Sequence, residues 1–132
     1  MSRDLMEVAV NLQKRYNKIN EIYELTKQMQ ESLYRNDIYS LKIIVRMRSE
    51  AMLEVDKIDT GREELINDFL ESERAAILNS MSVKAKPEEL TTPALKKIND
   101  IYMNTRKTLE KTIALDKIVN IKANKGNSNR AY

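Results

Sequence analysis

The chain contains no histidine, cysteine or tryptophan, and only two glycines and two prolines among its 132 residues. Without histidine or cysteine it cannot form a Ser–His or Cys–His catalytic pair, a disulfide, or a di-metal bundle site built on Glu-x-x-His motifs. It also lacks a glycine-rich phosphate-binding loop. Carboxylates such as Glu63, Glu64 and Asp68 do not have the spacing of a calcium-binding loop. We therefore expect no catalytic residue, no cofactor, no metal site and no enzymatic activity.

The sequence shows neither a targeting signal nor a membrane-spanning segment. The opening residues 1–5 read Met-Ser-Arg-Asp-Leu, which is not the apolar core of a signal peptide. No segment approaches the ~18–20 consecutive apolar residues that a membrane-spanning helix needs. We expect a cytoplasmic protein without a membrane span.

The sequence does contain three long stretches in which apolar residues recur every three or four positions. The first stretch contains Leu5, Val8, Leu12, Ile19, Ile22, Met29 and Leu33, with polar interruptions at Arg15 and Thr26. This spacing places one apolar stripe on one side of a helix, and that stripe must be buried against another element. The pattern predicts an all-α fold in which three long antiparallel helices form an elongated open bundle or coiled-coil hairpin.

Capping residues and a proline set the expected helix boundaries. Asn36 or Asp37 can cap the start of the second helix, and Thr92 followed by Pro93 is a strong start signal for the third. Beyond about residue 123 the apolar periodicity stops, which predicts a flexible tail. The expected organisation is a helical domain over 1–123 with helices at about 4–34, 37–79 and 93–122, and a flexible tail over 124–132.

Gly61 leaves two interpretations of the second helix. Thr60-Gly61-Arg62-Glu63 has the form of a capping box, which would start a new helix at this point. However, the apolar positions before and after Gly61 keep one heptad phase, and a single glycine costs a helix interior only ~1 kcal/mol. We favour one helix that continues to about Asn79 and bends near Gly61.

The expected helix lengths predict an incomplete core. At about 1.5 Å per residue the three helices measure roughly 45, 60 and 45 Å. If the third helix returns along the second, all three overlap only in the middle, and an apolar vacancy with the shape of another helix remains. We expect this vacancy to bind a partner helix; the alternative is an ordinary core or a homodimer seam. The residues predicted to line it are Ile38, Val45 and Met52 on the second helix and Leu109, Ile113 and Ile118 on the third.

Charge is unevenly distributed although the net charge is only +3. Residues 50–73 carry nine acidic groups against two basic groups, and the chain becomes basic from Arg106 onward. Two interpretations stay open: solvated helix faces, or an acidic flank and a basic end that orient a partner. No aromatic residues are interleaved with the basic ones to stack on bases, so we expect no nucleic-acid partner.

The junction between the first two helices resembles a known family, the flagellar type III export chaperones of the FlgN and FliT kind. The resemblance rests on the run Leu25, Met29, Leu33, Asn36-Asp37, Leu41, Arg48, Met52, Val55 and Ile58-Asp59, followed by Arg62, Leu65-Ile66 and Phe69-Leu70. In this family a helix ends at a short Gly/Asn-Asp turn, and a long second helix carries periodic apolar positions. The proline-containing connection and the third long helix follow the same plan.

This resemblance implies a cytoplasmic chaperone that binds the C-terminal helix of a flagellar hook-associated or filament-cap protein. It would prevent premature assembly of that client and deliver it to the export gate. Family members contact the export machinery through a tail tyrosine, which implies a partner-binding role for Tyr132. Tyr132 follows Gly126 instead of preceding it, which departs from the family pattern. The alternative is a structural or self-associating coiled-coil protein without a flagellar role.

Overall fold

The computed structural model describes residues 4–130, with side chains up to Asn124. Over this range the chain is helical and contains no β-strand, so the prediction of an all-α fold is confirmed. The elements are α1 (Met6–Tyr34), α2 (Ile38–Asn67), α3 (Glu71–Ser80), a single 3₁₀ turn η1 (Pro87–Glu89) and α4 (Pro93–Arg130). Three helices are long, as expected, and the short α3 was not predicted as a separate element.

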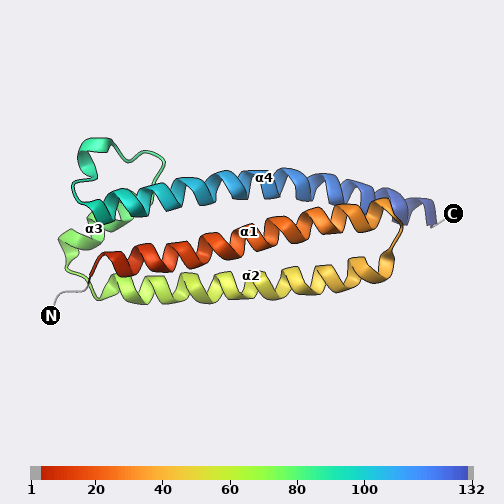
Figure 1. The fold of residues 1–132 in the computed structure, drawn as a ribbon, viewed down its shortest axis with the longest axis horizontal. Coiled ribbons are helices and arrows are strands. Elements are labelled where there is room, and N and C mark those ends of the chain that lie inside the picture. The colour runs from red at the N-terminus through yellow and green to blue at the C-terminus, as the bar shows by residue number, and fades with distance from the viewer. Residues whose placement is uncertain (1–3, 131–132) are drawn as a thin grey trace.

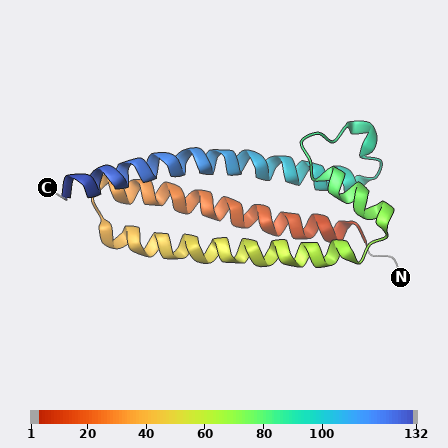
Figure 2. The same cartoon turned by 180° about the vertical axis from the view of Figure 1, so that it is seen from behind.

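The long helices form a bundle in which α1 is the central element (Figure 1). It packs against α2 on one side and against α4 on the other, and the reverse view shows the same arrangement (Figure 2). Helix α2 runs antiparallel to α1, whereas α4 runs in the same direction as α1. The expectation that the third long helix packs mainly along the second is therefore wrong, because α4 packs along α1.

Because α4 lies along α1, the three long helices overlap over most of the bundle and not only in its middle. Two of the three core clusters contain buried residues of α1, α2 and α4, and the partly buried Leu109 of α4 packs against the third. The largest cluster lies at the end where α3 joins the bundle; Val8, Leu12, Ile77 and Ile98 are among its buried members. The predicted vacancy therefore cannot be a missing third helix at either end.

The turn between α1 and α2 forms as the sequence predicts. Asn36 adopts a positive φ of 56°, a conformation that asparagine tolerates better than most residues. Asp37 caps α2, since its carboxylate accepts hydrogen bonds from the Ser40 amide at 3.0 Å and from the Ser40 hydroxyl at 2.6 Å. The bond from the Ser40 amide satisfies a free N–H of the first helical turn, and the two bonds together fix where α2 begins.

Helix α2 continues across Gly61 but ends earlier than predicted. Thr60 does not act as an N-cap, because its hydroxyl donates to the Asp56 carbonyl within the helix at 3.0 Å. The helix stops at Asn67 instead of about Asn79, and Phe69 then turns into the core. Glu73 accepts a hydrogen bond from the Leu70 amide at the start of α3. This break lets the chain cross the end of α1, so that α4 can begin beside the start of α1.

Helix α4 begins as predicted and ends later. The Thr92 hydroxyl accepts a hydrogen bond from the Leu95 amide at 3.1 Å, which is the expected cap ahead of Pro93. The backbone remains helical to Arg130, so the predicted helix end at about 122 is wrong. The polar residues after 123 carry no apolar stripe, but no proline stops the helix and Gly126 weakens it only modestly. The expected mobility of 124–132 stays a prediction.

We expect Gly61→Ala to stabilise the protein by about 0.5–1 kcal/mol, because glycine in a helix interior costs about that much relative to alanine. Apart from the backbone of its own helix and its chain neighbours, a Cβ at this position meets no atom within 4 Å, so no steric clash opposes the gain. Urea denaturation monitored by circular dichroism measures the change. A lower free energy of unfolding would mean that the helix is strained at Gly61.

The Asp37 cap predicts a specific pH dependence. The hydroxyl and then the amide of Ser40 hold the pKa of Asp37 below its ordinary value of 3.8. A lowered folded-state pKa means that the cap stabilises the protein fully above this ordinary value and loses its effect as the pH falls through the folded-state pKa. Asp37→Ala should lower the melting temperature at neutral pH, and this deficit should shrink in acid. Asp37→Asn, which keeps an acceptor for the Ser40 amide, should lower the melting temperature less than Asp37→Ala does. A deficit of Asp37→Ala that is equal at neutral and acid pH would contradict the assignment of Asp37 as the cap.

Candidate partner-binding groove

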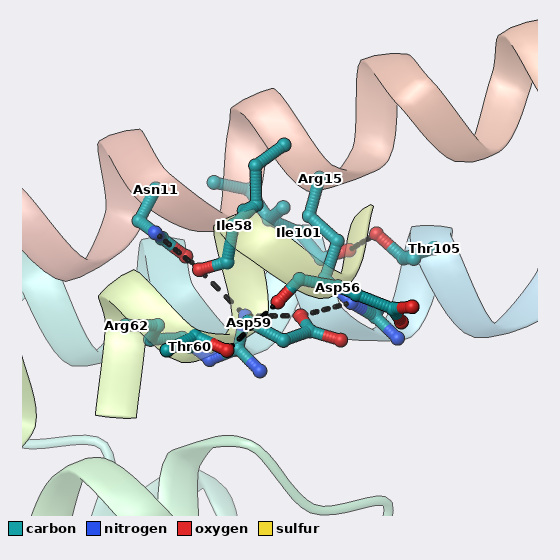
Figure 3. Close-up of polar contacts among 9 residues, drawn as sticks. All are labelled: Asn11, Arg15, Asp56, Ile58, Asp59, Thr60, Arg62, Ile101 and Thr105. Carbon is teal, nitrogen blue, oxygen red and sulfur yellow. Dashed lines mark hydrogen bonds and ion pairs between the residues drawn. The ribbon is translucent and has the colours of Figure 1, made fainter. Parts of the chain in front are cut away.

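A polar layer crosses the interface between α1 and α2 (Figure 3). The Asp59 carboxylate accepts from Arg15 of α1 at 3.0 Å and from Arg62 of its own helix at 2.8 Å. Asn11 donates to the Ile58 carbonyl at 3.0 Å and accepts from Arg62 at 3.3 Å. We call this network the Asp59 layer. All its charges are paired and partly buried, so it fixes the register of the two helices.

A second polar layer joins all three long helices. Arg48 of α2 donates to the Asp116 carboxylate of α4 at 2.6 Å and to the hydroxyl of Thr26 on α1 at 3.2 Å. Thr26 is fully buried, and its hydroxyl donates a hydrogen bond to the Ile22 carbonyl at 2.8 Å. We call this the Arg48 layer. It spans from α2 to α4 and therefore holds these two helices at a set separation.

The two layers are eleven residues apart on both α1 and α2, which is about 16 Å or three helical turns. Between them lies the smallest core cluster, formed by Ile19, Ile22, Ala51 and Val55. Helix α4 adds only the partly buried Leu109 to this cluster. The middle of the bundle is consequently the part with the least apolar packing.

Threonines explain why α4 contributes so little there. Thr105, Thr108 and Thr112 are buried toward α1, and each hydroxyl donates to the carbonyl four residues earlier in α4. Their small side chains let the helices approach, but their hydroxyls form no bond to another helix.

An open groove lies above this middle cluster, between α2 and α4. Its volume is about 480 Å³, and its lining is mainly apolar. Ile19, Ile22 and Val55 lie at its floor, and Arg15 and Arg48 line its two ends. We call it the central groove. It is the size of a few side chains from one face of a helix, and the carboxylates of Asp56 and Asp116 and the hydroxyl of Thr112 also line it.

Three of the predicted partner-binding residues meet in the central groove. Met52 of α2 and Leu109 and Ile113 of α4 line it, and the side chains of Met52 and Ile113 are 43% and 55% exposed. These exposures distinguish the two residues from an ordinary closed core. The groove exists for a different reason from the one predicted, because it lies over a thinly packed middle and not beside an absent helix.

The other predicted residues lie elsewhere. Val45 and Ile38 share the row of Met52 at seven-residue spacing but do not line the groove. Ile118 is exposed, but it follows Ile113 by five residues and so points about 140° away around α4. Tyr132 lies outside the described residues.

Sequence reasoning missed the two polar layers, although the signal was present. Arg15 and Thr26 interrupt the apolar repeat of the first helix. The turn centred on Asp37 fixes the antiparallel register, so each residue of α1 faces the residue of α2 that is equally far from Asp37. That rule pairs Arg15 with Asp59 and Thr26 with Arg48, which are the contacts observed.

Comparison with known proteins identifies no similar protein. No protein-family model matches the chain, and neither a curated protein nor a solved structure is significantly similar to it. Among the described residues, no helix combines the length and apolarity needed to cross a membrane. Acidic residues within 4–130 nowhere gather into a group that could hold a metal ion.

The Arg48 layer predicts a measurable contribution to stability. Arg48→Ala should lower the free energy of unfolding by about 1–3 kcal/mol, because it leaves Asp116 and Thr26 without their shared donor. Urea denaturation measures the loss, and a double-mutant cycle with Asp116→Ala isolates the pair. Arg46→Ala, on the exposed side of the same helix, is the matched control and should change stability by less than about 0.5 kcal/mol. Equal effects of the two substitutions would show that the layer contributes nothing specific.

Proposed function

We propose that this protein is a cytoplasmic export chaperone of the flagellar type III system, similar to the FlgN and FliT kind. Its client is a hook-associated or filament-cap protein, whose C-terminal helix it binds to prevent premature assembly before delivery to the export gate. The proposal rests on the resemblance of the α1–α2 junction to that family and on the central groove. The single structural observation that supports it best is the exposure of Met52 and Ile113 above a thinly packed core.

The geometry of the central groove suits an amphipathic helix. Its two ends are closed by ion pairs about three turns apart, so the occupant presents about three turns of apolar side chains. Residues of the client at i, i+3 or i+4, and i+7 would contact Ile19, Ile22 and Val55 at the floor. Met52 adds a flexible side chain that adapts to different apolar surfaces.

A client helix in this position gains affinity from burying surface that is otherwise exposed to water. Apolar area contributes about 25 cal/mol per Å², and a few central anchors usually carry most of the binding free energy. Met52 and Ile113 are the anchors on the chaperone side, because they stand on opposite walls of the groove. In this function the chaperone needs no catalytic group.

The proposal predicts separable effects on binding and folding. Met52→Asp and Ile113→Asp should retain the helix content of the wild type, because both side chains already contact solvent. Each should weaken binding of the C-terminal helical segment of a hook-associated or filament-cap protein by about tenfold or more, since a charge would be buried under the client. Isothermal titration calorimetry with both client segments measures the affinity, and circular dichroism measures the fold.

Leu53→Asp is the matched control, because Leu53 is 61% exposed on the same helix and does not line the groove. It should leave client affinity unchanged. Absence of binding to any hook-associated or filament-cap segment would refute the flagellar role. If sedimentation instead showed a homodimer that Met52→Asp dissociates, the groove would be a self-association seam and the coiled-coil alternative would hold.

A further inference from the structure

A second apolar cleft lies at the end of the bundle, where α2 meets α3. Its volume is about 490 Å³, and most of its lining is apolar. Ile66 of α2 is 7% exposed at its floor, whereas Leu78 of α3 is 58% exposed at its wall. We call it the α2–α3 cleft. It exists because α2 breaks after Asn67 and α3 packs on the bundle through Ile77, which leaves the opposite face of α3 uncovered.

The border of this cleft is predominantly acidic. Glu63 of α2 and Glu71 of α3 line it from two directions, and Arg74 is the one basic residue in the lining. Both glutamates are exposed, and they belong to the acidic segment 50–73. An apolar floor between carboxylates is complementary to a helix that carries leucine or isoleucine on one face and lysine or arginine beside it.

We propose that the α2–α3 cleft is a separate docking surface for a basic amphipathic helix of a partner protein. Leucine-like side chains of this helix contact Ile66, Ala75 and Leu78, and its lysine or arginine side chains pair with Glu63 and Glu71. The Asp59 layer lies between this cleft and the central groove, because Asp59 falls between Val55 and Glu63 on α2. The surface is therefore independent of the groove that the proposed function uses.

The experiment uses the full chain and two synthetic helical peptides with the same leucine positions, one flanked by lysines and the other by glutamates. Fluorescence anisotropy at low and high salt measures both affinities. The lysine peptide should bind about tenfold more tightly than the glutamate peptide at low salt, and added salt should reduce the difference. Glu63→Lys/Glu71→Lys should remove this preference, and Leu78→Ser should weaken both peptides.

Two matched variants test position. Glu88→Lys/Glu89→Lys reverses the same number of exposed charges on η1, and Val83→Ser removes an exposed apolar side chain outside the cleft. Neither should change the affinity of the lysine peptide, and Met52→Asp in the central groove should not change it either. Circular dichroism of each variant establishes that it is folded; Glu63→Gln/Glu71→Gln replaces the double reversal if that variant unfolds.

Several outcomes would overturn the proposal. They are equal binding of the two peptides, an equal loss with the η1 reversal, or a loss with Met52→Asp, which would place the peptide in the central groove. A further contradicting outcome comes from sedimentation of the unliganded protein. A dimer that Glu63→Lys/Glu71→Lys dissociates would assign the cleft to a second copy of this chain. Failure of client segments to bind the central groove leaves this proposal intact, because it is measured with different peptides and different variants.

Discussion

The position of α1 between two other helices is the constraint on which the rest of the structure depends. A central helix must be apolar toward both neighbours, whereas each outer helix needs only one apolar stripe. Helix α1 meets this demand along its length, where buried residues run from Val8 and Leu12 through Ile19 and Ile22 to Met29. Because α2 and α4 both pack on α1, the sides of α2 and α4 that face each other move apart with distance from α1. Any space between them that side chains do not fill remains open as a groove.

The two polar layers determine where this space lies. Ion pairs that are partly buried contribute little net stability compared with apolar packing, but their geometry tolerates no shift in register. Asp59 bonded to Arg15 and Arg48 bonded to Asp116 therefore position α2 against α1 and α4 against α2. The segment between the layers is left with a short apolar floor, which explains why the central groove is bounded at both ends.

The elements that depend on local chemistry were predictable from the sequence. The Asp37 cap and the Thr92 cap follow from residues within one turn, and the continuity of the helix across Gly61 follows from the apolar phase that the residues before and after it share. The break after Asn67 was not predictable in this way, because neither glycine nor proline marks it and Phe69 keeps the apolar phase. The helix ends there because Phe69 and Ile77 are buried only if the chain turns across the end of α1. Such a tertiary cause leaves no local signal.

The candidate site was predictable only in part, for a related reason. Periodicity identifies Met52, Leu109 and Ile113 as apolar helix positions, but it does not say how completely a neighbour covers them. That coverage depends on the side chains around them, and in the groove the neighbour that α4 supplies beside Leu109 and Ile113 is the small, buried Thr112. Ile118 shows where periodicity fails, since its periodic position predicts a partner-binding residue although it does not line the groove.

The threonines give the groove its physical basis. Each of Thr105, Thr108 and Thr112 satisfies its hydroxyl within α4, so burying it costs little, yet each adds less apolar area than leucine would. Helix α4 therefore stays close to α1 without closing the space beside α2. A larger apolar residue at Thr112, which lines the groove, would pack this space and stabilise an isolated bundle, at the cost of the surface that a partner helix contacts. The threonine stripe thus leaves the middle of the bundle folded but incompletely covered, which is the condition that a helix-binding groove requires.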